Sequence, residues 1–405
     1  MIYRMLNPLL PYDWGSSSYI QNLLGRKDLE GKPVAEMWLG AHPKAPSSVI
    51  PAKAGTGKGI HPTPKNLPSL IAADPQKHLG RRHDLFSDRL PFLLKILAAR
   101  MPLSIQAHPN LKQAREGFKR ENLQGIHLDA QERNYKDDNH KPELICALTP
   151  FLALCGFRAY EEIIANFRAL HLESVFPCFA DFVKAPNPGA LQNLFIAMLF
   201  SEGQTRKDHI NRLLRALYLS TDEALNACIH RLAEHFPDDI GIYAPLFLNL
   251  IELKPAEAMY LEAGVLHAYL EGAGIEIMAN SDNVLRGGLT PKHIDLQELA
   301  RVVSFHPYSP SLIGNEAGNH KITDYDCPAT EFHLQRLSLS EDEEYTLEDI
   351  DLPRILLCMD GTCICKANDL SVFLTAGQSI FVPADNKSLL VKGGATLFIA
   401  SPSLQ

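Results

Sequence analysis

The segment Leu261–Lys292 has the sequence LEAGVLHAYLEGAGIEIMANSDNVLRGGLTPK. Its short glycine and asparagine turns separate apolar runs, a pattern typical of tightly folded strands. These runs carry a histidine, an acid and an arginine, at His267, Glu276 and Arg286. We expect the segment to form one wall of a polar site in a β scaffold, with the other wall far upstream.

A weak internal repeat supports the β scaffold. Tyr260–Gly264 (YLEAG) matches Phe373–Gly377 (FLTAG), and each copy leads into a strand with the same spacing. Where the first copy has His267, the second has Ile380. Two copies of one β unit predict paired jelly rolls, of which only the first carries polar chemistry.

The middle of the chain predicts helices instead. Apolar residues recur at helical spacing over 191–199, 210–217 and 225–232, and Ser220, Thr221 and Asp222 are suitable caps before the last stripe. We expect an α-helical domain inserted into the β scaffold. The predicted division is a catalytic jelly roll (1–150 with 243–325), a helical insertion (151–242) and a C-terminal jelly roll (326–405).

Composition bounds the class of protein. The 405 residues are 46% hydrophobic and 21% charged, as in folded globular proteins, and the length predicts more than one core. A net charge of −8 argues against a nucleic-acid partner. The N-terminus lacks a signal-peptide pattern and no run is long enough for a membrane span. Eight scattered cysteines are typical of reduced thiols in a cytoplasmic protein.

Two local patterns imitate functional motifs. Gly55–Gly59 (GTGKG) lacks the glycine spacing and the hydroxyl residue of a phosphate-binding loop. Cys358, Cys363 and Cys365 do not form a CxxC pair, and the Asp360-Gly361 dipeptide between them predicts a β-hairpin. Neither pattern is assigned a function.

Upstream, short alternating segments place polar groups on one face. Leu103–His108 alternates with period two, so Ser104, Gln106 and His108 share a face in a strand. Asn139–Leu144 is interpreted as a second strand, with Lys141 and Glu143 on one face and His140 on the other. Lys95 stands inside the apolar run Phe92–Leu97, where it either snorkels to an edge or faces a polar cavity.

Four of these polar residues together suit a divalent metal. Gln106, His108, Glu143 and His267 offer an amide oxygen, two imidazoles and one carboxylate, for which zinc is the most natural choice. Only one ligand is negative, so the ion stays Lewis-acidic. An iron-dependent oxygenase remains an alternative, although Gln106 as a fourth ligand disfavours it. A non-enzymatic binding or regulatory protein is the other alternative.

Longer motifs resemble the type I mannose-6-phosphate isomerases, also called phosphomannose isomerases. They are YDWG (12–15), EMWLGAHPKAPS (36–47), QAHP (106–109), DDNHKPEL (137–144) and HAYLEGAGIEIMANSDNVLRGGLTPK (267–292). The resemblance covers the catalytic parts to about residue 300. The rest matches mainly in its general pattern of expected helices and strands. Gly287-Gly288 departs slightly from the family, at a place that carries no metal ligand.

The resemblance implies a mainly β fold of cupin-like jelly-roll domains with an inserted α-helical domain. It implies that Gln106, His108, Glu143 and His267 bind one zinc ion and that Arg286 is the catalytic arginine. The reaction would interconvert mannose 6-phosphate and fructose 6-phosphate through an enediol, in a cytoplasmic enzyme of carbohydrate metabolism that serves GDP-mannose biosynthesis. A monomer with a sugar-phosphate substrate is expected, without nucleic acid or membrane.

The remaining roles stay open among several residues. Proton transfer needs a base of tuned pKa near positive charge, and Glu276, Lys141 and His140 all qualify. Four further residues are expected to contact the substrate. Lys95, Ser104 and Lys292 could hold its phosphate, and Trp14 of the YDWG motif is the fourth.

Overall fold

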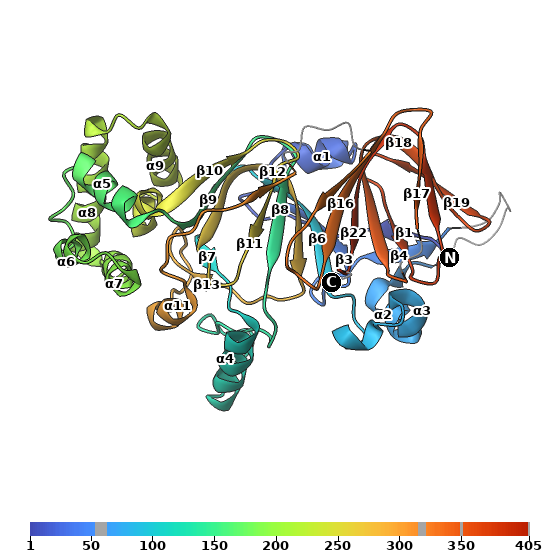
Figure 1. The fold of residues 1–405 in the computed structure, drawn as a ribbon, viewed down its shortest axis with the longest axis horizontal. Helices are drawn as coiled ribbons and strands as arrows, with labels where there is room; N and C mark the ends of the chain where they lie inside the picture. The colour runs from blue at the N-terminus through green and yellow to red at the C-terminus, as the bar shows by residue number, and fades with distance from the viewer. Residues whose placement is uncertain (53–62, 315–320, 349–350, 404–405) are drawn as a thin grey trace.

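The computed structural model describes residues 1–52, 63–314, 321–348 and 351–403. Within these ranges the strands form two sheets of 11 strands each, and a group of helices lies beyond one end of them (Figure 1). The predicted mainly β fold with a helical insertion is therefore confirmed. The Gly55–Gly59 motif lies outside the described residues.

The central sheet carries most of the polar residues singled out above. Its main path follows the order β14-β11-β8-β12-β6-β3-β2. In that order the strands are Leu312–Ile313, Ala258–Leu261, Glu143–Ala147, His267–Ala279, Phe92–Ala99, Glu36–Gly40 and Leu9–Leu10. Beside this path lie β7 (Gln106–Ala107), β9 (Phe151–Phe157), β10 (Leu248–Leu253) and β13 (Leu285–Arg286).

The second sheet is built mainly from the C-terminal third. Its main path is β15-β16-β22-β18-β20-β1-β4-β5. The strands are Ile322–Tyr325, His333–Leu339, Ala395–Ser401, Arg354–Ala367, Ser379–Val382, Tyr3–Leu6, Ser48–Pro51 and Lys65–Asn66, with β17 (Glu344–Leu347), β19 (Leu370–Thr375) and β21 (Leu389–Lys392) beside them.

The helices gather mostly between β9 and β10, at the left of Figure 1. There lie α5 (Tyr160–Ala169), α6 (Phe179–Lys184), α7 (Pro188–Leu199), α8 (Gly203–Ala216), α9 (Glu223–His235) and α10 (Ala244–Phe247). Elsewhere lie α1 (Tyr19–Leu23), α2 (Leu67–Ala73), α3 (Pro75–Leu79), α4 (Leu111–Leu123) and α11 (Leu296–Val302). Short 3₁₀ turns are η1 (Lys27–Leu29), η2 (His83–Phe86), η3 (Leu217–Leu219) and η4 (Ile240–Tyr243).

The three helical stripes read from the sequence coincide with α7, α8 and the start of η3, and α9. Of the three proposed caps, Asp222 is the N-cap of α9, and its carboxylate accepts a hydrogen bond from the Leu225 amide at 2.9 Å. The apolar faces of these helices pack into one buried cluster with residues of the central sheet, such as Leu270 and Leu285. Burial of the stripes therefore fixes the helices against the sheet.

Two strand assignments differ from the expected division. Residues 151–157, placed above in the helical part, form β9, which pairs with β10 and β12. Near the N-terminus, β1 pairs with β20, and Tyr3 lies opposite Phe381. The expected division places these two residues in different rolls. The blue strands among the red ones in Figure 1 show this crossing. Local patterns carry no information on pairing over such separations.

Three local expectations were also too simple. The strand expected over Leu103–His108 shrinks to the two residues of β7, and β8 begins only at Glu143, so residues 139–142 form a loop. No hairpin turns at Asp360-Gly361, because β18 continues through both residues with a register shift after Cys358. The positive φ of 72° at Gly361 accommodates this bulge.

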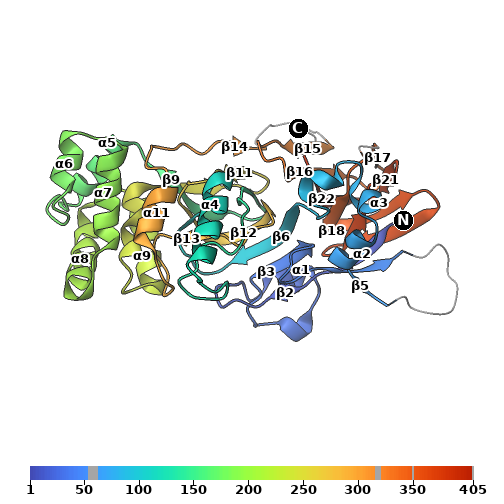
Figure 2. The same cartoon turned by 90° about the horizontal axis from the view of Figure 1, so that it is seen from below.

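Both rolls share an apolar core, which joins them into one packed body. Phe92 and Ile275 of the central sheet belong to the same buried cluster as Ile355 and Phe398 of the second sheet. Figure 2 shows the sheets of the two rolls following one another along the molecule. Among the helices the structure describes, none has the length and apolar character needed to cross a bilayer.

Candidate metal centre and active site

Three buried side chains at strand ends form a compact group. His108 follows β7, Glu143 opens β8 and His267 opens β12. Nε2 of His108 lies 3.3 Å from Oε1 of Glu143, and Nε2 of His267 lies 3.4 Å from Oε2. One potential ligand atom from each residue lies within 4.8 Å of the other two. The sheet thus brings together three predicted ligands from positions 108, 143 and 267.

The atoms that face one another in this group have no hydrogen-bond partner among the described residues. They are Nε2 of His108, Nε2 of His267 and Oε2 of Glu143. Leaving such an atom buried and unpaired costs about 1–3 kcal/mol. Each residue is at most 2% exposed. A divalent ion satisfies all three atoms at once, so the donor set fits zinc.

The opposite nitrogen of each imidazole is held by a backbone carbonyl. His108 Nδ1 lies 2.7 Å from the Asn283 oxygen, and His267 Nδ1 lies 3.0 Å from the Val265 oxygen. A carbonyl only accepts, so both Nδ1 atoms carry the proton and both Nε2 atoms present a lone pair. The histidines are therefore fixed in the tautomer that binds metal through Nε2.

Charges around the group favour the same protonation states. Burial acts to raise the pKa of Glu143, but Lys141 and His108 outweigh it, and the pKa falls well below its ordinary value. The Lys141 Nζ lies 2.8 Å from Glu143 Oε1. Burial, aided by Lys141, lowers the pKa of His108 to about 4. An ionised carboxylate beside a neutral imidazole is the form that a metal requires.

Gln106 lies on β7, the strand next to His267, and Arg286 lies on β13, on the other side of β7. Gln106 is the partner of His267 across β7 and β12, and of Arg286 across β7 and β13. Both residues are partly exposed, unlike the three buried ligands. Burial lowers the pKa of Arg286 from its very high ordinary value, but the guanidinium keeps its charge at neutral pH. An amide thus adjoins the metal group, and a cation lies one strand farther away.

A second charged cluster lies farther along β12. Glu276 is the cross-strand partner of Lys95, whose Nζ lies 2.7 Å from Glu276 Oε2 and 3.6 Å from Glu36 Oε1. All three side chains are buried. Burial tends to lower the pKa of Lys95, but Glu276 and Glu36 raise it overall. Lys95 therefore faces a polar cluster, which is one of the two alternatives that the sequence left open. It already has two carboxylate partners.

Glu276 itself has the pKa shift of a proton carrier. Burial raises its pKa, Lys95 acts in the opposite direction, and Glu143 raises it further. The influence of Glu143 ties this cluster to the metal group. A raised pKa is one property expected of an acid that exchanges protons with a substrate.

Sequence reasoning missed three residues of this region. Tyr269 is buried, its ring centroid lies 6.0 Å from that of His267, and its hydroxyl has no hydrogen-bond partner among the described residues. Trp38 Nε1 donates to Glu36 at 2.8 Å, and its ring lies 5.3 Å from Lys95 Nζ. Period two from His267 points to Tyr269, and the quoted 36–47 motif contains the other two.

A register shift in β12 explains how its polar residues reach a common region. Pairing with β9 slips between Tyr269 and Glu271. A bulge reverses which alternate residues face the interior, so odd-numbered His267 and even-numbered Glu276 both point inward. Strict alternation along the segment would have put them on opposite faces.

The other predicted site residues have varied surroundings. His140 Nε2 lies 2.6 Å from Glu331 Oε1, outside the metal group. Lys292 is exposed, and burial, Arg286 and Lys44 lower its pKa, which places these cations near one another. Ser104 is partly exposed, between residues that bond to Tyr269 and Gly288. Trp14 stacks on Tyr12 with ring centroids 5.8 Å apart and packs against the cluster that contains Tyr269.

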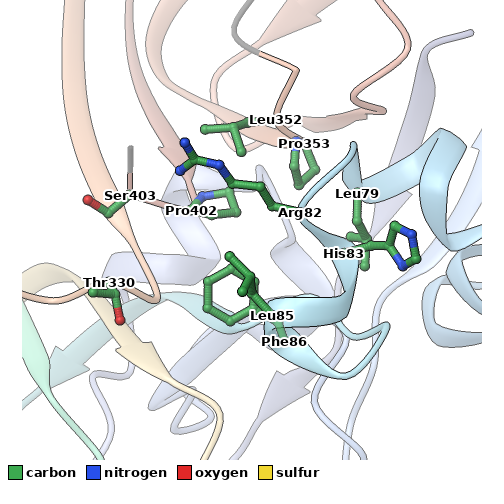
Figure 3. Close-up of a pocket in the computed structure, with 10 residues that line it drawn as sticks. All are labelled: Leu79, Arg82, His83, Leu85, Phe86, Thr330, Leu352, Pro353, Pro402 and Ser403. Atoms are coloured by element: carbon green, nitrogen blue, oxygen red, sulfur yellow. The ribbon is translucent and has the colours of Figure 1, made fainter. Parts of the chain in front are cut away.

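Two surface hollows lie apart from these residues. One, of about 270 Å³, separates α3 and η2 from the end of the second roll (Figure 3). It is lined by Leu79, Arg82, His83, Leu85, Phe86, Thr330, Leu352, Pro353, Pro402 and Ser403. Another, of about 630 Å³, lies between the central sheet and α9, where Arg231 and Glu271 line it. Neither hollow includes a residue of the metal group.

The fold and the buried His–Glu–His group define a metal-binding protein of paired jelly rolls with a helical insertion. Family models agree: residues 2–160 match the type I phosphomannose isomerase catalytic domain, and residues 163–248 match its helical insertion domain. The chain is 36% identical to mannose-6-phosphate isomerase of Salmonella typhimurium, over 97% of this chain and 98% of the relative. It is 34% identical to the Homo sapiens enzyme, over 94% and 93%. The chain belongs to the type I phosphomannose isomerase family.

Solved structures extend the likeness to the whole chain. The Salmonella typhimurium mannose 6-phosphate isomerase bound to substrate (f6p) and zinc superposes with a TM-score of 0.90 at 35% identity, covering 100% of both chains. A zinc-bound holo structure of mannose 6-phosphate isomerase gives a TM-score of 0.89. Residues 249–405, which lie beyond the two family models, are thus part of the shared fold.

Proposed function

We propose that this protein is a zinc-dependent aldose–ketose isomerase that interconverts mannose 6-phosphate and fructose 6-phosphate. The observation that carries the proposal is the buried His108–Glu143–His267 group, whose three unpaired ligand atoms fit a metal ion. Family membership and a relative bound to zinc and f6p support it.

In this proposal His108, Glu143 and His267 hold the zinc ion and Gln106 is the fourth ligand. Gln106, which carries this side-chain amide, lies directly opposite His267 in the sheet. When bound, the ion supplies positive charge that polarises substrate oxygens. The two nitrogens and one oxygen without partners account for a tight site, and Gln106 is the partly exposed member of the set.

We propose Glu276 as the residue that moves the proton between C1 and C2. It is buried, its pKa is raised, and Lys95 keeps a positive charge 2.7 Å from it, which stabilises the carboxylate after each proton release. Lys141 is the second choice, since its Nζ is already engaged with Glu143 at 2.8 Å. His140 is the third, because its Nε2 is bonded to Glu331.

For the remaining contacts we propose that Arg286 stabilises the enediolate and that Lys292 and Ser104 hold the phosphate. A guanidinium stays charged in a half-buried setting, as stabilisation of an oxyanion requires. Lys292 offers an exposed ammonium near Arg286. Lys95 loses its proposed phosphate role, since a buried lysine with two carboxylate partners instead fits the support of Glu276. Trp14 remains a proposed wall of the substrate pocket.

The test is a coupled isomerase assay with mannose 6-phosphate on the zinc-loaded and the chelated protein. We expect activity that chelation removes and zinc restores. Activity that survives complete removal of metal contradicts the metal role, and a zinc-loaded protein without turnover contradicts the substrate. Glu276→Gln, which keeps the shape but not the acid, should lose most of kcat while it retains zinc.

We further propose that the protein works as a cytoplasmic monomer and serves GDP-mannose biosynthesis. Eight free cysteines support a reducing compartment. Sedimentation at micromolar concentration tests the monomer: a mass near 45.0 kDa supports it and twice that mass opposes it.

The three-part division of the chain is likewise a proposal. The run of helices α5 to α10 and the family match over 163–248 support a helical unit that begins after β9. Mild proteolysis should cut near its two edges, and cuts scattered through residues 90–145 would oppose the division.

A further inference from the structure

Asn283 connects two metal-group residues that come from distant parts of the chain. It lies in the turn between β12 and β13 and is fully buried. Its backbone oxygen accepts the hydrogen bond from His108 Nδ1 at 2.7 Å. This bond fixes both the tautomer and the ring orientation of His108. The main chain of Asn283 therefore sets one side of the metal group.

The side chain of the same residue grips another segment. Its Oδ1 accepts from the backbone amides of Lys136 at 2.7 Å and Asp137 at 3.2 Å. Its Nδ2 donates to the backbone oxygens of Asp137 at 2.9 Å and Asn139 at 2.8 Å, and to Asp137 Oδ1 at 3.2 Å. The amide thereby uses its full hydrogen-bonding capacity. The gripped segment, 136–139, leads within four residues to Glu143.

Neighbouring polar groups brace the same contact. Ser281 Oγ donates to Asp137 Oδ1 at 2.8 Å, and the Asp282 amide donates to Asp137 Oδ2 at 2.7 Å. The Asn283 amide in turn donates to Ser281 Oγ at 3.2 Å. A loop that needed only closure would be satisfied by backbone bonds. Here a buried side-chain network ties the turn to the segment before β8.

We propose that Asn283 is a positioning residue of the metal centre, which sets the placement of His108 relative to Glu143 and thereby the affinity for zinc. Asn283 holds His108 through its backbone carbonyl, and it holds the segment before Glu143 through its side-chain amide. Groups that orient metal ligands in this way change metal affinity by about 10–100-fold when they are altered. The inference rests on the proposed zinc function only for the identity of the ion.

The decisive variant is Asn283→Asp, which keeps the size and the acceptors but removes both Nδ2 hydrogens. It also places a carboxylate against two backbone oxygens and Asp137. The matched control is Asn386→Asp in the second roll. Asn386 is 2% exposed, and its Nδ2 donates to the backbone oxygens of Met1 and Pro383 at 3.1 and 2.9 Å. Both variants disrupt a buried asparagine clamp, but only the first clamp contacts the metal group.

The measurement is the zinc dissociation constant by competition with a chelator, with unfolding free energies of the metal-free proteins beside it. We expect Asn283→Asp to raise the zinc Kd by about 10–100-fold and Asn386→Asp to change it by less than about twofold. Equal zinc Kd values for wild type and Asn283→Asp would overturn the proposal. A rise of equal size in Asn386→Asp would do the same, since it would show a general effect of instability.

A milder variant keeps the test open if Asn283→Asp does not fold. Ser281→Ala removes the hydroxyl that braces Asp137 and receives the Asn283 amide. It should raise the zinc Kd by at least about threefold, and an unchanged Kd would overturn the proposal. Because zinc binding is measured directly, a wild-type protein that binds zinc but does not isomerise mannose 6-phosphate refutes the proposed function and leaves this inference standing.

Discussion

The turns before β12 and before β20 have the same backbone but opposite chemistry. Gly264 and Gly377 both have φ of 80°, and each lies three residues before a buried strand residue. In the first roll this residue is His267, 1% exposed, with an unpaired Nε2. In the second it is Ile380, 0% exposed, inside an apolar cluster. One scaffold thus supports a metal group at one place and plain core at the other.

The comparison shows what a functional site costs in such a scaffold. Ile380 contributes hydrophobic burial of about 2 kcal/mol. His267 gives up that gain and leaves a polar atom unsatisfied until a metal binds. The stability that the first roll loses at its site is supplied elsewhere, by the apolar core that both rolls share.

The strongest way to break the comparison is to give the first roll the residue of the second. His267→Ile should abolish zinc binding and lower kcat by about 10³-fold, since a metal supplies several kcal/mol of transition-state stabilisation. The unfolding free energy of the metal-free variant should not fall, because the change removes an unpaired imidazole. Metal analysis and the coupled assay check this outcome. A variant that keeps one zinc per chain would contradict the assignment of His267.

Substitution of Arg286 tests the role of a positively charged side chain separately from the role of the metal. Arg286→Ala should lower kcat by about 10²–10³-fold while zinc content stays at the wild-type level, because the lost group stabilises developing negative charge rather than the ion. Arg286→Lys, which keeps a positive charge, should recover part of the rate. If kcat were unchanged in the alanine variant, Arg286 would have no catalytic role.

The reverse exchange tests the second roll. Ile380→His should lower the unfolding free energy by about 3 kcal/mol, from lost apolar burial and an imidazole without a partner. Zinc content should not rise above that of wild type, because Ile380 is surrounded by apolar residues of its cluster. Chemical denaturation and metal analysis are the measurements. A stable variant would mean that the second roll tolerates polar groups as the first does.

The smallest expected effect concerns the hydrogen-bonded contact between His140 and Glu331, which joins the loop before β8 to the segment before β16. Burial acts to raise the pKa of Glu331, but the bond from His140 lowers it overall. A lowered folded-state pKa contributes stability above the ordinary pKa of 4.5, and this contribution is lost as pH falls through the folded-state value. At neutral pH, Glu331→Gln should cost about 0.5–1 kcal/mol.

The check is denaturation of wild type and Glu331→Gln at pH 7 and at pH 3. The difference between the two proteins should be largest at pH 7 and shrink at pH 3. A difference that is independent of pH would show that the pair contributes through packing alone.

Particular residues show how far the sequence could be followed. Residue type and spacing selected His108, Glu143 and His267 only as a set with Gln106, because two imidazoles, a carboxylate and an amide together suit a divalent metal. Lys95 was recognised as unusual inside an apolar run, but its partners were not. Glu276 lies 181 residues away, and the sheet register that pairs them is a long-range property. Glu36 and Trp38 were not predicted as neighbours of Lys95 for the same reason.

The sequence alone determined which residues could do chemistry and that the stripes over 191–199, 210–217 and 225–232 form helices, since both follow from local side-chain type and periodicity. Tertiary structure decided what those residues face. The register shift after Tyr269 brings Glu276 and His267 to one region, the pairing of β1 with β20 draws the N-terminus into the second roll, and Asn283 links His108 to the segment before Glu143. Each depends on pairing between distant segments, whose free energy arises only when both are in place.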